Sequence, residues 1–115
     1  MDDSLIRQLI DRITREFAVH QPPLNNDATE VRVRSLHSHL GTIRQLVTDA
    51  SWAVNASSEF VSLKHATDEL ERCREDLFYL YQNAVIDGRM NAGVGGMLDE
   101  LDRTLRSATD PEYMS

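Results

Sequence analysis

His37 and His39 are the residues whose type and spacing most invite a chemical interpretation. Imidazole is a frequent zinc ligand, and a helical zinc site places its ligands three or four residues apart. Residues two apart on a helix point about 200° away from each other, so the two rings cannot share a metal ion there. On a strand both rings would face one side and could. We interpret them as polar residues beside a helical seam and expect no metal site.

The other candidates for chemistry lack the partners that their reactions need. The glycine cluster at residues 93–96 is not followed by the Lys-Ser or Lys-Thr pair of a phosphate-binding loop, so we predict a hinge or turn over residues 89–96. Asp99, Glu100 and Asp102 stand where acids favour the start of a helix. No serine lies in a Gly-x-Ser-x-Gly motif. We therefore expect no enzyme, no cofactor and no small-molecule substrate.

Apolar residues recur at steps of three and four in four stretches of the chain, which is the pattern of amphipathic helices. Pro22-Pro23 ends the first stretch, and Asp87-Gly88 supplies a left-handed residue to close the third. Residues 31–34 alternate valine and arginine, so a short strand stays open as an alternative there. The predicted helices are residues 4–20, 28–54, 58–87 and 97–108.

The second and third stretches carry matched seams, Val33 to Val54 and Leu63 to Ala84, each 22 residues long. Because only a short break separates them, we expect antiparallel neighbours. We predict an all-α fold: a four-helix up-and-down bundle built on a long antiparallel helical hairpin. Residues 1–110 would form the single domain and residues 111–115 a flexible tail. The bundle would close either within one chain or by dimerisation.

Charge is unevenly distributed along the chain. The formal net charge is −7, and residues 58–115 hold twelve acids and six bases, which disfavours nucleic-acid binding. Asp68 and Asp76 are each four residues from Arg72, so we expect both pairs on one exposed helix surface. No apolar run approaches the ~18 residues that cross a bilayer. The N-terminus opens with acids rather than with the bases of a secretory signal, so we expect a soluble cytoplasmic protein without a membrane partner.

These observations favour a non-enzymatic protein–protein interaction module, acting as an adaptor, assembly subunit or chaperone-like factor through apolar helical seams. Its partners would be a second copy, giving a homodimer, or a helix of another protein. Trp52 is either a bundle residue or an interface anchor. The single cysteine, Cys73, cannot form an internal disulfide and is expected to be a buried thiol. The candidate interaction residues are Leu70, Leu77, Phe78, Leu80, Tyr81 and Val85.

Residues 34–41 carry the pattern Arg-x-Leu-His-x-x-Leu-Gly. This spacing resembles the phosphoacceptor helix of one class of bacterial sensor histidine kinases, whose dimerisation domain is also a two-helix hairpin. The resemblance implies that His37 would be the phosphoacceptor of a phosphotransfer or signalling-dimer domain. The sequence departs from the family at Ser38, where the family usually has an acid. These 115 residues contain no nucleotide-binding domain, so we expect no autokinase activity.

A third hypothesis uses the acidic clusters at residues 68–76 and 99–102. An acidic surface can imitate a phosphate backbone, so the chain could act as an inhibitor that mimics nucleic acid. Binding of that kind would be lost at high salt.

Overall fold

All secondary-structure elements in the described part of the chain are α-helices. The computed structural model describes residues 4–19 and 27–109. It contains α1 (Ser4–Val19), α2 (Asp27–Ser51), α3 (Ala56–Gln82) and α4 (Gly88–Thr109). The all-α prediction is confirmed, and residues 31–34 belong to α2, so the strand alternative is wrong. The predicted tail, residues 111–115, lies outside the described residues.

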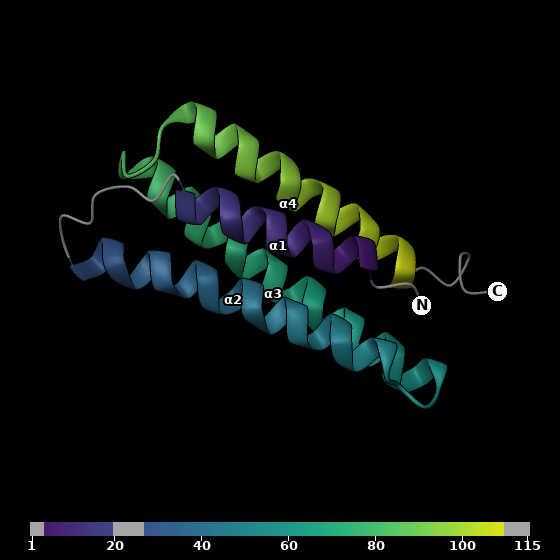
Figure 1. Cartoon of the computed structure of the whole chain (residues 1–115). Helices are drawn as coiled ribbons and strands as arrows, with labels where there is room; N and C mark the ends of the chain where they lie inside the picture. The colour runs from purple at the N-terminus through teal and green to yellow at the C-terminus, as the bar shows by residue number, and fades with distance from the viewer. Residues whose placement is uncertain (1–3, 20–26, 110–115) are drawn as a thin grey trace.

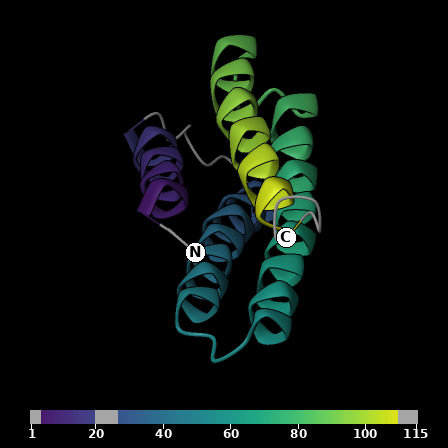
Figure 2. The same cartoon turned by 90° about the vertical axis from the view of Figure 1, so that its right-hand side faces the viewer.

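Successive helices run in opposite directions along one long axis (Figure 1). Within the described residues, α1 contacts α2 and α4, and α3 also contacts α2 and α4. The most extensive contact joins α2 and α3, which form an antiparallel hairpin reaching beyond the ends of α1 and α4 (Figure 1 and Figure 2). α2, with 25 residues, and α3, with 27 residues, are the two longest of the described helices.

One hydrophobic core draws side chains from all four helices. The apolar spacing of three and four puts these residues on one face of each helix, and burial of that face stabilises helices whose isolated segments would be marginal. Fully buried members include Ile13 and Phe17 from α1, Leu36 and Ile43 from α2, Leu63, Leu70 and Leu80 from α3, and Leu101 and Leu105 from α4.

The central helices end earlier than the seams predict. α2 stops at Ser51 rather than near residue 54, and α3 stops at Gln82 rather than near residue 87. Val54 and Ala84, predicted as the last residues of the two seams, consequently lie in the connections, and Val54 is 93% exposed. Trp52, which follows α2 directly, is 81% exposed.

Asn55 is the N-cap of α3, because its side-chain oxygen accepts a hydrogen bond of 2.8 Å from the Ser58 amide. At the other end the left-handed residue is Ala84, with φ 56°, so Gly88 does not close the helix. A non-glycine residue in this region is uncommon.

The predicted turn over residues 89–96 is wrong, because these residues form the first half of α4. Asp87 caps the helix, its carboxylate accepting a hydrogen bond of 2.8 Å from the Met90 amide. Each glycine costs a helix about 1 kcal/mol relative to alanine. Burial of Val94 and Leu98, each 1% exposed, offsets that cost, since burying one such side chain contributes about 1.5–3 kcal/mol.

Candidate functional site

The predicted interaction residues divide into a buried set and an exposed set. Leu70, Leu77 and Leu80 are at most 5% exposed and belong to the core of the chain itself. A partner could not reach these leucines, so their assignment as contact residues is corrected. Phe78 is 62% exposed and Tyr81 43% exposed, while Val85 packs partly buried against the core. Successive residues of a helix are rotated by about 100°, so Phe78 lies just outside the buried face of α3 to which Leu77 belongs.

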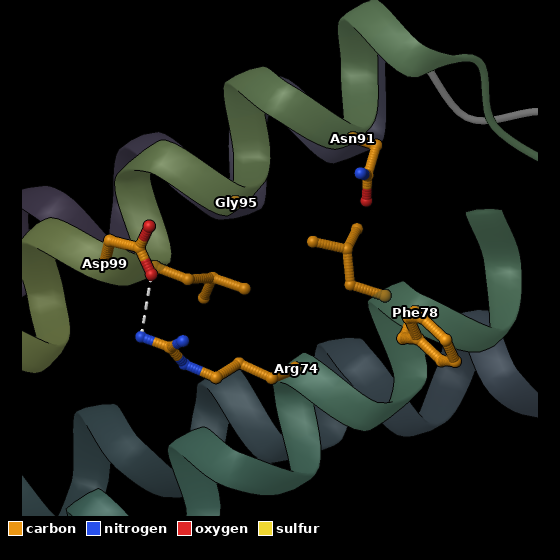
Figure 3. Close-up of a pocket in the computed structure, with 7 residues that line it drawn as sticks. Arg74, Phe78, Asn91, Gly95 and Asp99 are labelled. Atoms are coloured by element: carbon orange, nitrogen blue, oxygen red, sulfur yellow. Dashed lines mark ion pairs between the residues drawn. The ribbon is translucent and has the colours of Figure 1, made fainter.

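A groove of about 200 Å³ lies between α3 and α4 beside Phe78 (Figure 3). Leu77 and Leu98 supply its apolar surface. Gly95 leaves one wall without a side chain, and a Cβ built there would meet only Leu77 Cδ2, at 3.9 Å. Gly95, which was predicted to lie in a turn, therefore contributes to the space of the groove.

Polar groups mark both ends of the groove. Arg74 Nη2 lies 2.8 Å from Asp99 Oδ1 at one end, and the Asn91 amide points inward near Phe78 at the other (Figure 3). Arg74 also lies 3.7 Å from Asp102, while its Nε is buried without a hydrogen-bond partner. An apolar centre with a few polar groups at its edges is the usual composition of a small binding site.

A different arrangement joins α3 to α2, where ionisable side chains pair across the contact and one of them, Asp76, is buried. Arg32 Nη1 lies 3.0 Å from Asp76 Oδ1, and the Asp76 side chain is only 4% exposed. His39 Nδ1 lies 2.6 Å from Glu69 Oε2. His39 Nε2 is 3.9 Å from the second Asp76 oxygen, which has no hydrogen-bond partner. We call these four residues the polar seam.

The polar seam fixes how α2 and α3 align. Arg32 and His39 are seven residues apart on α2, and their partners are seven residues apart in reverse order on α3. A shift of one helix along the other would leave the buried Asp76 carboxylate without its cation, which is costly. Arg32 also lies 4.6 Å from the centre of the Tyr79 ring, a cation–π contact. This seam specifies the alignment of the two helices and holds no substrate-sized space.

The sequence prediction for Asp76 was wrong. Asp76 faces α2 rather than solvent, and Arg72 forms its ion pair with Glu69 rather than with an aspartate. The sequence signal for the seam is the seven-residue spacing of ionisable residues beside each apolar seam, Arg32 and His39 on α2 and Glu69 and Asp76 on α3.

Cys73 lies on α3 between the two acids of the polar seam. It is fully buried, which confirms the expected buried thiol. Burial, with smaller contributions from the charges of Asp76 and Glu69, raises the pKa of its thiol to about 12. The thiol therefore stays protonated and is unsuited to redox chemistry in the folded chain.

His37 and His39 face different helices, as the helical spacing predicts. The His37 ring packs edge-on against Phe17 of α1, with 5.4 Å between the ring centroids. Burial lowers the pKa of His37, which favours the neutral ring. No carboxylate among the described residues forms an ion pair with His37, so the acid that usually assists a phosphoacceptor histidine is missing there. Nor do the described residues contain a group of three potential ligands that could hold a metal ion.

The two acidic clusters are partly neutralised by ion pairs. Asp99 pairs with Arg74, and Asp102 Oδ1 lies 2.9 Å from Arg106 Nε. Asp76 is buried in the polar seam. These pairings remove three carboxylates from the free surface charge that a nucleic-acid mimic would use.

Comparisons with protein-family models, with curated proteins and with solved structures found no match to this chain. None of the described helices is both long enough and apolar enough to span a bilayer.

Proposed function

We propose that this chain is a non-enzymatic protein–protein interaction module. In this proposal the four helices form an up-and-down bundle that presents α3 and α4 to a partner, which is a second copy or a helix of another protein. The module would serve as an adaptor, assembly subunit or chaperone-like factor in the cytoplasm.

The observation that carries the proposal is the pair of exposed aromatic residues beside the groove. Phe78 and Tyr81 stay 62% and 43% exposed although the core beneath them is filled by Leu77 and Leu80. The core does not need these rings, and the groove next to Phe78 offers room for an apolar side chain. Exposed aromatics next to a cavity are typical of the central residues of interfaces.

A surface substitution tests this proposal without disturbing the core. Phe78→Asp should leave the helical circular dichroism unchanged but lower the solution mass measured by light scattering, or abolish binding of a partner identified by cross-linking. Trp52→Ser is the control, since Trp52 is also an exposed aromatic but lies in the connection between α2 and α3, whereas Phe78 lies near the opposite end of α3. If Phe78→Asp and Trp52→Ser both retain every association of the natural protein, the groove is not the docking surface.

The phosphotransfer alternative has its own measurement. Incubation with a small phosphodonor, followed by a search for acid-labile label on His37, would reveal it. The packing of His37 against Phe17 leads us to expect no label.

A further inference from the structure

Two exposed stripes on α1 and α3 have the same spacing in opposite chain directions. Each runs in steps of three, four and three residues, which keeps its members on one side of a helix. The α1 stripe is Leu5, Gln8, Arg12 and Arg15, and the α3 stripe is Phe78, Glu75, Glu71 and Asp68; all eight residues are exposed.

The charges of the two stripes are opposite and mostly unpaired. Within the described residues, Arg12 and Arg15 form no ion pair, and neither do Asp68 and Glu75. Glu71 is joined only to Arg106, at 3.9 Å. Arg44, an exposed arginine outside the stripes, has a close partner: its Nε lies 3.0 Å from Asp11 Oδ1. Two matching positions therefore carry charges of opposite sign: Arg12 corresponds to Glu71, and Arg15 corresponds to Asp68.

An apolar group stands at the corresponding end of each stripe. Leu5 begins the α1 stripe and is 55% exposed, while Phe78 begins the α3 stripe beside the groove. A cavity of about 150 Å³ holds a benzene molecule, so a groove of about 200 Å³ has room for a leucine side chain.

We infer that the occupant of the groove is α1 of a second copy of this chain, lying antiparallel along α3. Leu5 enters the groove beside Phe78, Arg12 faces Glu71, and Arg15 faces Asp68. The inference rests on the proposed function and names its partner. Burial of the apolar anchor provides most of the affinity, and the charges select the partner and its direction. Reciprocal contacts would close a dimer, whereas one-way contacts would join further copies.

Charge reversal on each stripe provides the test. One variant carries Arg12→Glu and Arg15→Glu, and a second carries Asp68→Lys and Glu71→Lys. Each variant alone brings like charges together and should reduce the association constant at least tenfold in analytical ultracentrifugation. An equimolar mixture restores opposite charges at every α1–α3 contact and should recover association to within about threefold of the natural chain, because like-charge pairing is removed. All four positions are exposed, so circular dichroism should show an unchanged fold.

A matched control keeps the change in net charge equal. Arg89→Glu with Arg103→Glu reverses two exposed arginines on α4 that belong to neither stripe, and should associate like the natural chain. Association of the natural chain should also weaken as salt is raised from 0.05 to 0.5 M.

Three results would overturn the inference: a natural chain that stays monomeric at millimolar concentration, single variants that associate normally, or a mixture that fails to recover. If the stripe variants associate normally while Phe78→Asp does not, the α1 partner is wrong and the proposed docking surface survives. If the stripe variants and Phe78→Asp all associate normally, both the α1 partner and the proposed docking surface are wrong.

Discussion

The side of α3 that faces α2 and the side that faces α4 differ in the kind of contact they make. Toward α2, the side chain of Asp76 is only 4% exposed and forms an ion pair with Arg32. Toward α4, Gly95 contributes no side chain to the contact, and a groove of about 200 Å³ stays open to solvent. One side is thus committed to a single neighbour inside the chain. The other keeps apolar surface that a second molecule could cover.

This difference shows how one helix can serve both fold and binding. A buried ion pair contributes little net stability but makes other alignments costly, because each would leave a charge without its partner. The polar seam thereby holds α3 in a fixed position on α2. A rigid support of this kind lets the opposite side of α3 present Phe78 in a defined orientation, which reduces the entropy lost on binding.

The largest expected effect probes the closed side through Cys73. Because the pKa of its thiol rises from 9.0 to about 12, the thiolate fraction at pH 8 falls about thousandfold. Labelling of the native chain by an aromatic disulfide should therefore be at least a thousandfold slower than labelling of the urea-unfolded chain, followed by absorbance. Rates within tenfold of each other would show that α2 and α3 separate readily and would remove the contrast between the two sides.

The next largest effect comes from removing the cation of the polar seam. Arg32→Ala leaves the Asp76 carboxylate buried without its ion pair, a change that costs about 3–5 kcal/mol in fully buried pairs. Arg32 is 42% exposed on its side chain, so we expect about 2 kcal/mol less free energy of unfolding. Urea denaturation measures this difference.

Arg34→Ala is the control for Arg32→Ala. Arg34 lies on the same helix and pairs with Glu30, but its side chain is 75% exposed. Exposed pairs contribute about 0–1 kcal/mol, so this variant should remain close to the natural chain. Equal losses in the two variants would mean that burial of Asp76 is not what distinguishes the α2 side.

The contrast between the two sides also explains what could be predicted from the sequence. The spacing of apolar residues from Leu63 to Leu80 is a local pattern, so the helices were predictable from the sequence. The Arg32–Asp76 pair joins residues 44 positions apart, and no local pattern specifies it. The groove was missed for a different reason. Glycine propensity predicts a break at residues 93–96, whereas the Asp87 cap and the burial of Val94 outweigh that propensity.

The smallest expected effect tests whether the α4 side is open. Gly93 and Gly95 lie two residues apart on α4, but a Cβ would meet nothing within 4 Å at Gly93 and only Leu77, at 3.9 Å, at Gly95. Alanine should therefore raise the free energy of unfolding at both positions, by about 0.5–1 kcal/mol each, as helix propensity dictates. Thermal and urea unfolding would measure the gain. A loss of stability in Gly95→Ala would mean that the groove is narrower than the structure shows.

Larger side chains at the same two positions distinguish an effect on folding from an effect on association. Gly95→Phe should fill the groove and weaken association with the partner, because the ring would occupy the space left for Leu5. Gly93→Phe places the same ring on open surface and should leave association unchanged. Equal association in these two variants, with both folded by circular dichroism, would show that the hollow beside Phe78 has no part in binding. The openness of the α4 side would then be a packing feature of a glycine-rich helix.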